Sequence, residues 1–493
     1  MMKAPLPALL TLTALAALTA CTVGPDYKGP PGVASDAATR GTFIRANDAA
    51  LIPAPGVARW WEGLNDPILT GLVDDALARS PSIDIAQARI RQARASLTQQ
   101  QASQLPSASA NATFLHAQLP GVDVGSSGDT SGTGASAGSN SSTAIDFYNL
   151  GLNASWEPDL FGGIRRSVEQ SRAQVGQRFA DLADAQVSLS AQVAQAYVNL
   201  RDTQARARLN AQSTALQRRA LDLTRQRYAA GTASALDIER LQNQLETTDA
   251  QNIPLAAQID EYRGQIAVLT GREPGALDAT LSTVVPVPLP PARVAIGDPA
   301  TLIAHRPDVR SAERALAANT AAVGVNRAKQ LPGLKFMGIL GLGGTNPDDV
   351  FDFNKLTTLI TPSISWSFLD FGRNHAAVRQ SEAQRDEAEA QYRQTVLQAL
   401  QDAETSLSRF GNLRLQLAGL GRAEASASRS VMLNDQRVGA GTSSIIDQLD
   451  IQRQQLAAGI AVAQGKSALT NSYIAVQKSL GLGWTAPSNL PLR

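Results

Sequence analysis

Two long stretches of the chain carry apolar residues at the three- and four-residue steps of an α-helix. Residues 164–227 contain no proline and a single glycine, and residues 374–437 form a second stretch of the same length. In the first stretch the apolar positions are Val175, Phe179, Leu182, Leu189, Val193, Ala196 and Leu200. This spacing predicts helices that pack along a coiled-coil seam. At 1.5 Å per residue, each helix would be roughly 95 Å long.

Four shorter segments instead alternate apolar and small polar residues with a period of two. They lie at about residues 107–115, 149–157, 334–343 and 359–368. One apolar and one small polar face over about 9–11 residues is typical of strands in a membrane β-barrel. Trp156 and Trp366 fall near strand ends, where aromatic residues lie at a membrane interface. The pattern alone leaves open a soluble hairpin that packs on helices.

The pattern of helices and strands occurs twice. RVGAGTSSIIDQLD at Arg437 has an earlier copy, RYAAGTASALD at Arg227. The same offset of 210 residues relates Trp156 to Trp366, Gly271 to Gly481 and Asp237 to Asp447, whereas Pro81 and Pro307 differ by 226. The 16 additional residues fall in an interval that contains a Gly/Ser-rich loop, residues 121–142. The chain is therefore predicted to be two tandem repeats.

Each copy of this segment predicts a tight turn between a long helix and a shorter one. Gly231 and Gly441 suit the left-handed conformation that ends a helix. The candidate N-caps of the following helices are Thr232 or Ser234 in the first copy and Thr442 or Ser444 in the second. Each copy is thus predicted to be the tip of a helical hairpin.

The N-terminus has the features of a targeting segment. Its apolar run, Leu9 to Leu18, is too short to span a membrane, and LTAC, ending at Cys21, resembles a bacterial lipoprotein cleavage box. Cys21 is the only cysteine, so it cannot form an intrachain disulfide. We expect Cys21 to carry lipid. An ordinary secretory peptide with a chance cysteine is the alternative. Thr22, in place of an Asp, favours the outer membrane.

The predicted organisation follows from these boundaries. It comprises a signal peptide (1–20), an extended N-terminal tether (21–59), a first repeat (60–271), a linker (272–304), a second repeat (305–483) and a tail (484–493). The fold class is mainly α with a membrane β-barrel.

Residues that could support catalysis are sparse. The three histidines, His116, His305 and His375, are scattered, and one cysteine cannot complete a usual His/Cys metal site. GILGLGG at residues 338–344 has no following helix of a phosphate-binding unit. The 44 basic and 43 acidic residues show no basic stripe, which argues against nucleic-acid binding. We expect no enzymatic activity, no metal and no cofactor other than the covalent lipid.

Several segments together resemble the TolC-like outer-membrane channel family, in the lipoprotein (NodT-type) branch of resistance–nodulation–division efflux systems. They are CTVGPDY at Cys21, WWEGLNDPILTGLV at Trp60, SWEPDLFGGIR at Ser155, RYAAGTASALDIERLQ at Arg227, HRPDVRSAE at His305 and LDFGR at Leu369. The resemblance implies a homotrimer with a twelve-stranded barrel in the outer membrane and a long periplasmic α-helical tunnel. It also implies a periplasmic adaptor and an inner-membrane pump as partners. Four strands alone cannot close a barrel, and lipid does not tolerate an open sheet edge.

The resemblance also assigns a channel gate. Asp447 and Asp450 are three residues apart and share one helix face, a spacing that is equally compatible with a solvated surface. The family places such residues at the channel constriction, so that a trimer gathers six carboxylates, with Asp237 at the facing position. Like charges about 6 Å apart repel by roughly 3 kcal/mol at an effective dielectric near 20. We expect such a ring to hold protons or bind cations.

Two further features of the tips follow from the resemblance. The family's Tyr- and Arg-mediated latch cannot be carried over, because Val438 and Ser443 occupy those positions. The adaptor is expected to dock on the two exposed turns, whose residues are Ala230, Gly231, Thr232, Ala440, Gly441 and Thr442.

The sequence therefore predicts a passive exit duct for small molecules such as drugs, anchored in the outer membrane and extending into the periplasm. A duct for type I protein secretion is the alternative within transport. A structural coiled-coil lipoprotein without a pore is the alternative from another class, and the alternating strands argue against it, because a spacer needs no barrel.

Overall fold

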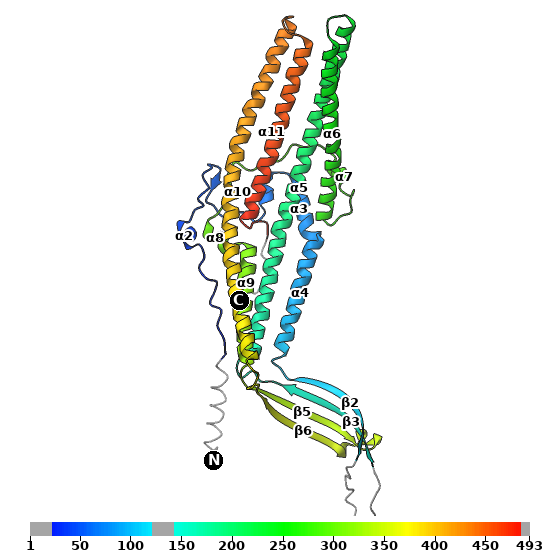
Figure 1. Cartoon of the computed structure of the whole chain (residues 1–493), viewed down its shortest axis with the longest axis vertical. Coiled ribbons are helices and arrows are strands. Elements are labelled where there is room, and N and C mark those ends of the chain that lie inside the picture. Colours follow the sequence, from blue (N-terminus) through cyan, green and yellow to red (C-terminus); the bar gives the residue numbers. More distant parts are fainter. Residues whose placement is uncertain (1–21, 121–141, 485–493) are drawn as a thin grey trace, which may run out of the picture. The chain divides into compact units, whose positions relative to one another are not determined.

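The computed structural model describes residues 22–120 and 142–484 (Figure 1). The predicted signal peptide, Cys21, nearly all of the Gly/Ser loop and nearly all of the tail lie outside the described residues. The chain divides into two compact units. The first comprises Met1–Gly29, Ala93–Gln174 and Leu316–Glu387, and the second comprises Pro30–Gln92, Val175–Ala315 and Ala388–Arg493.

The first unit contains a four-stranded antiparallel sheet of order β2-β3-β5-β6 (Figure 1). Its strands are β2 (Ser107–Pro120), β3 (Ser142–Trp156), β5 (Gly333–Gly344) and β6 (Leu356–Ser365). Strands β2 and β6 are the edges, and neither has a second partner strand among the described residues. The two hairpins of the sheet therefore come from the two sequence repeats.

The strand boundaries differ from those predicted in two places. Strand β2 continues to Pro120 and strand β3 begins at Ser142, because their backbone ladder extends beyond the part with clear alternation. Strand β6 begins at Leu356 and ends at Ser365, three residues before the predicted end, because Ser365 pairs with Gly333, the first residue of β5. Trp366 therefore follows β6 rather than lying within it.

The register places apolar residues from all four strands on one face of the sheet. Cross-strand partners on this face include Ala112 with Leu150, Leu152 with Leu340, and Gly338 with Ile360, and many of its large side chains are exposed. The opposite face carries mainly Ser, Asn, Thr and Gly, and its large apolar residues include Leu115, Phe147, Met337, Ile339 and Leu359. An exposed apolar face is the arrangement expected of a sheet that contacts lipid.

Aromatic pairs bound this apolar face at both ends. Trp156 stacks on Phe336 at a centroid distance of 5.9 Å, and Phe114 lies 4.9 Å from Tyr148. At about 3.4 Å per residue, the strand from Tyr148 to Trp156 is about 27 Å long, and a tilt of roughly 40° reduces this to about 21 Å along the membrane normal. This height is close to the apolar band of a membrane barrel, which is about 25 Å.

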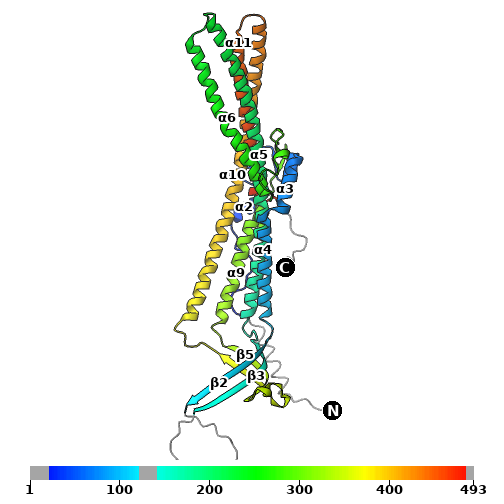
Figure 2. The same ribbon diagram turned by 90° about the vertical axis from the view of Figure 1, so that its right-hand side faces the viewer.

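The helices follow the predicted repeat closely. The long helices α5 (Gly163–Ala229) and α10 (Arg373–Gly439) have 67 residues each, and the helices that follow them, α6 (Ala235–Leu269) and α11 (Ile445–Ser479), have 35 each (Figure 2). Helices α4 (Pro81–Ala102) and α9 (Pro307–Ala328) precede the first strand of each repeat. The long helices extend one or two residues beyond the predicted ends.

No helix in the described ranges combines the length and the apolar composition needed to cross a membrane.

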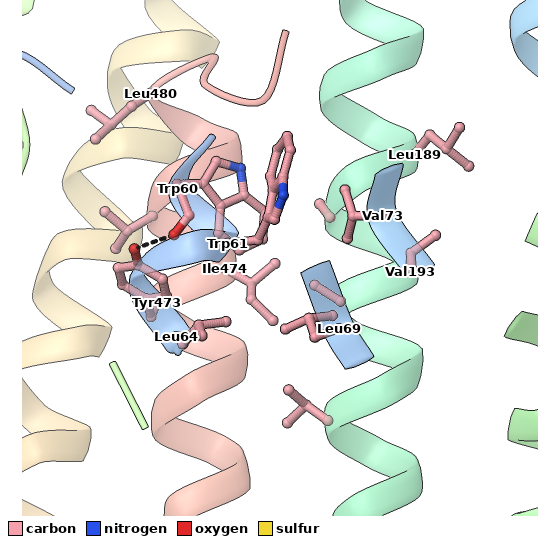
Figure 3. Packing of buried hydrophobic residues seen from close by; sticks show 14 of the residues in the cluster. Trp60, Trp61, Leu64, Leu69, Val73, Leu189, Val193, Tyr473, Ile474 and Leu480 are labelled. Atoms are coloured by element: carbon pink, nitrogen blue, oxygen red, sulfur yellow. Dashed lines mark hydrogen bonds between the residues drawn. The ribbon is translucent and has the colours of Figure 1, made fainter. Parts of the chain in front are cut away.

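The hydrophobic core of the second unit lies around the middle of α5. Trp60 and Trp61 of η1 (Trp60–Leu64) and Leu69 of α3 (Pro67–Arg79) pack against α5 and α11 (Figure 3). The Tyr473 hydroxyl donates a hydrogen bond of 3.1 Å to the Trp60 carbonyl. Along the predicted seam, Leu189, Val193, Ala196 and Leu200 are buried, whereas Val175, Phe179 and Leu182 are only half-buried.

Two segments predicted as a tether and a linker are part of this core. Helix α2 (Ser35–Arg40) and strand β1 (Leu51–Ile52) lie in the first, and Phe43 and Leu51 are buried. Helix α7 (Asp278–Leu281), strand β4 (Val294–Ala295) and helix α8 (Pro299–His305) lie in the second. Strands β1 and β4 pair in parallel, so residues 30–59 are not an extended tether. Their apolar residues have no regular period although several of them belong to the core cluster, so periodicity could not reveal this packing.

Candidate channel gate and helical tips

Each long helix ends in the same glycine-based turn. Gly231 has φ 70° and Gly441 has φ 71°, a conformation that L-residues rarely adopt. The Thr232 amide donates to the Arg227 carbonyl at 2.8 Å, and the Gly231 amide donates to the Tyr228 carbonyl at 2.9 Å. These two hydrogen bonds define a Schellman motif, and the second tip repeats them. Thr232 therefore closes the long helix and does not cap the next one.

The following helices begin with identical capping boxes. Ser234 and Ser444 are the N-caps, which decides between the two candidates that the sequence offered for each tip. The Ser444 hydroxyl is 2.7 Å from Oδ2 of Asp447, and the Asp447 amide donates back to Ser444 Oγ at 3.1 Å. Asp237 makes the same contacts with Ser234. Both aspartates thus hold the start of a helix.

The surroundings of these aspartates favour the ionised form. Hydrogen bonds from the Ser444 side chain and backbone, together with Arg437 and Arg227, hold the pKa of Asp447 below its ordinary value. Ser234 lowers the pKa of Asp237 in the same way. Within one chain Asp447 is therefore a carboxylate. If the six carboxylates of a trimer formed a ring, their protonation would require repulsion from the charges of the neighbouring copies.

Asp450 lies one turn further along α11 and is paired within its own helix. Its Oδ1 accepts a hydrogen bond of 2.9 Å from Nη2 of Arg453, and its Oδ2 accepts one of 2.9 Å from Nε2 of Gln454. Arg453 was not among the residues predicted from the sequence, although an Asp and an Arg three residues apart on a helix are the signal for such a pair. Arg453 offsets part of the negative charge that the two aspartates contribute.

The second hairpin closes on itself through polar side chains. Ser443 Oγ donates to Asn434 Oδ1 at 2.9 Å, and Gln448 Nε2 donates to Asp435 Oδ1 at 2.5 Å. Each contact joins the end of α10 to the tip or to the start of α11. Ser443, which stands at a position of the family latch, therefore makes a contact within its own hairpin.

The histidines and the glycine-rich segment considered as possible sites take part in the fold. His116 lies opposite Asp146 on neighbouring strands, with Nδ1 2.7 Å from Oδ1, and His305 ends α8 with Nδ1 3.0 Å from the Thr301 carbonyl. Residues 338–344 lie in strand β5 between β3 and β6, so they do not form a phosphate loop. Within ranges 22–120 and 142–484, no group of three or more His, Cys, Asp or Glu could hold a metal ion.

Comparison with known proteins decides the family. The profile of the outer membrane efflux protein family matches residues 72–272 and 299–482, which include both hairpins and all four strands of the sheet. The chain belongs to the outer membrane efflux protein family. It is an outer-membrane protein and a channel component of an efflux system, and the family is one of transport proteins.

Individual relatives agree over nearly the full length. The pyoverdine export outer membrane protein OpmQ of Pseudomonas aeruginosa is 31% identical over 438 residues, which are 87% of this chain and 88% of OpmQ. Nodulation protein T of Rhizobium leguminosarum bv. trifolii is 26% identical over 95% of each chain. The solved outer-membrane channel OprN is 32% identical, with a TM-score of 0.83 over 94% of this chain and 100% of OprN. The predicted fold class, mainly α with membrane strands, is confirmed.

Proposed function

We propose that three copies of this protein form the passive outer-membrane exit duct of a tripartite efflux pump for small molecules. The observation that carries this proposal is the four-stranded sheet, which has an exposed apolar face and whose edge strands, β2 and β6, each have one free edge within the described part of the chain. Three copies would supply twelve strands, with β6 of each copy paired to β2 of the next.

Membrane chemistry makes closure necessary. Unpaired backbone N–H and C=O groups cost several kcal/mol each in hydrocarbon, so an open sheet edge cannot face lipid. Four strands are too few to enclose a lumen, because barrels with a filled interior already need about eight. Closure between copies satisfies both edges with the same interface, as a cyclic oligomer requires.

The helical hairpins supply the periplasmic part of the proposed duct. Each long helix extends about 100 Å at 1.5 Å per residue. Both turns are exposed: apart from the adjacent residues, no heavy atom of the described chain lies within 4 Å of a Cβ built on Gly231 or Gly441. A periplasmic adaptor would dock on these turns and connect the duct to an inner-membrane resistance–nodulation–division pump. The name of OpmQ, which refers to pyoverdine export, supports a small-molecule cargo.

Lipidation of Cys21 completes the proposal, with the lipid as an anchor and no catalytic group on the duct. Asp447, Asp450 and Asp237 would lie at the periplasmic mouth and control the passage of charged solutes.

Reconstitution tests this function directly. Full-length protein purified in detergent should migrate on a gel as a trimer, and heating should convert it to a faster monomer band. It should also produce discrete conductance steps in a planar bilayer. Its gene should also restore drug resistance to a strain that lacks its outer-membrane duct but keeps pump and adaptor. A monomer without heat-modifiable migration or conductance would instead support the structural spacer.

A further inference from the structure

The segment that directly follows Cys21 lies in a site that other residues of the first unit form. Arg166, near the start of α5, is 4% exposed, and its guanidinium is directed at this segment. Nε donates to the Val23 carbonyl at 3.2 Å, Nη2 donates to the Gly24 carbonyl at 3.4 Å and to Asp26 Oδ1 at 2.5 Å, and Nη1 donates to Glu169 at 2.7 Å. A buried guanidinium needs such partners, because an unpaired buried charge strongly destabilises a fold.

Backbone and packing contacts extend the site along the segment. The Val23 amide donates to the Phe161 carbonyl at 3.1 Å, and Tyr27 packs against a small cluster of buried alanines on α5 and α9. Thr22 fits against Gly162, where an added Cβ would lie 2.5 Å from its methyl carbon. Similarly, a Cβ on Gly324 would lie 2.8 Å from Arg166 Cγ and 3.0 Å from the Val23 carbonyl oxygen. The site therefore has the shape of the segment that fills it.

The second repeat lacks this site, so the repeat fold does not require it. The position equivalent to Arg166 is Ala376, and among residues 22–120 and 142–484 nothing except the adjacent residues lies within 4 Å of a Cβ built on Gly372, the equivalent of Gly162. Phe371 there is 93% exposed, whereas the equivalent Phe161 is half-buried. The contacts of Arg166 therefore serve to hold the N-terminal segment and are not a feature of the repeat fold.

The location of the site explains what it does. It lies at the junction between the end of β3 and the start of α5. The aromatic pair Trp156 and Phe336 is at the same end of β3. Thr22, which directly follows the expected lipidation site in the sequence, lies against Gly162 at this junction. The aromatic pair marks the membrane interface of the sheet. A lipid on residue 21 would therefore enter the membrane at the level at which the strands leave it.

We propose that Arg166, Gly162 and Gly324 form a receptor site for residues 22–27, and that this site holds the lipid anchor of Cys21 at the rim of the membrane sheet. The second part of the proposal rests on the proposed function, because the anchor and the membrane sheet belong to it. The first part concerns docking alone and can be tested on unlipidated protein.

Docking is tested in the Cys21→Ser protein, which has no cysteine. A spin label on Lys28→Cys, an exposed position next to the segment, should show restricted motion. Arg166→Met removes the hydrogen bonds to the segment, so the label should become mobile and amide exchange at Val23 should speed up by about tenfold or more. A factor of ten corresponds to about 1.4 kcal/mol of local stability. Asp26→Asn, whose side chain is largely exposed, should act in the same direction without threatening the fold. Arg172→Met, an exposed arginine on the same helix, is the matched control.

Placement of the anchor is tested by pulse–chase labelling of trimer assembly in cells. With Cys21 intact, Arg166→Met should slow the appearance of heat-resistant trimer severalfold relative to Arg172→Met. With Cys21→Ser, Arg166→Met should cause no further delay, because there is no anchor to place. A label that is equally restricted in the Arg166→Met and Asp26→Asn proteins would overturn the receptor site. An equal delay in both backgrounds would overturn its role in placing the anchor. The spin-label and amide-exchange readouts depend neither on trimer formation nor on channel conductance, so failure of the proposed function would be recognised separately from failure of the receptor site.

Discussion

The indole Nε1 of Trp156 donates a hydrogen bond of 3.1 Å to the backbone carbonyl of Gln104. The second repeat contains the same contact, between Trp366 and Gln330, also at 3.1 Å. Each glutamine lies two residues beyond the end of α4 or α9, where helix carbonyls lack intrahelical partners. The indole therefore ties the end of a helix to the end of the second strand of its hairpin, and it does so in both repeats.

Removing these indole hydrogen bonds should weaken the junction between helices and sheet. We expect Trp156→Phe and Trp366→Phe each to lower the free energy of unfolding by about 0.5–1.5 kcal/mol, the usual net value of such a hydrogen bond. Thermal unfolding of the detergent-solubilised protein measures this. Phe336→Leu, which loses only the stacking on Trp156, separates the ring contact from the hydrogen bond. An unchanged midpoint in both tryptophan variants would show that the contact contributes nothing.

The carboxylates of the second tip should govern ion passage. We expect Asp447→Ala combined with Asp450→Ala to weaken cation preference and abolish block by trivalent cations from the periplasmic side, because both carboxylates are removed from the narrow mouth. Single-channel recording in planar bilayers measures both effects.

The capping box supplies the control for this experiment. Ser444→Ala breaks the cap of α11, at about 1 kcal/mol, but keeps both carboxylates. It should leave selectivity and block unchanged, which separates charge from helix stability. If the double variant behaved like Ser444→Ala, the aspartates would lie on a solvated outer face. Arg453→Gln, which frees Asp450 from its partner, should instead strengthen cation preference.

The helical turns should be sensitive to bulk if they contact an adaptor. We expect Ala230→Trp and Ala440→Trp to weaken adaptor crosslinking and efflux without loss of trimer. These alanines are exposed and have negative φ, unlike the adjacent Gly231 and Gly441, where any side chain would strain the turn itself. Met432→Trp, at another exposed position on α10, tests whether bulk matters away from the turn. Normal crosslinking of both turn variants would exclude the turns as the docking surface.

Mass spectrometry of the mature protein tests the anchor. We expect the N-terminal residue to be Cys21 with a diacylglyceryl group and an amide-linked acyl chain. Cys21→Ser should remove the lipid while the sheet still inserts, because the pairing of the strands does not depend on the lipid. A mature N-terminus at any other residue would rule out this modification.

Asp184 should make stability depend on pH. Burial, together with Asp308, raises its pKa, against the opposing effect of Lys478 and Arg306. A carboxyl group with a raised folded-state pKa stabilises the fold below its unfolded pKa of about 3.9 and loses that contribution as pH rises through the folded value. Asp184→Asn should therefore raise the unfolding temperature at neutral pH, and the gain should shrink in acid.

Asp181, one turn earlier on α5, provides the contrast for this prediction. It accepts hydrogen bonds from Ser311 at 2.6 Å and from Arg178 at 3.0 Å, so Asp181→Asn should not stabilise the protein at neutral pH. Thermal scans of the two variants between acid and neutral pH compare them. A gain for Asp184→Asn that did not change with pH would mean that its charge is not the cause.

Local sequence patterns were enough to predict the long helices, the tips and the strands. Part of helix α5, from Val175 to Leu200, shows a heptad pattern that only Gln186 interrupts, because the spacing of a helix repeats every turn. The turn at Gly231 and its copy at Gly441 were recognisable because glycine adopts the left-handed conformation more easily than other residues. The apolar face of the sheet followed from the alternation around Trp156, since a strand repeats every two residues.

Tertiary structure decided how distant segments use these elements. Arg166 looks like an ordinary charged residue of a helix, and only folding brings it to Val23 and Asp26, which precede it by about 140 positions. Phe43 and Leu51 lie in a stretch without a period, yet both are buried in the core of the second unit. Contacts of this kind leave no pattern along the chain. A local sequence rule reports which face of an element is apolar, and the packing of the whole chain determines what covers it.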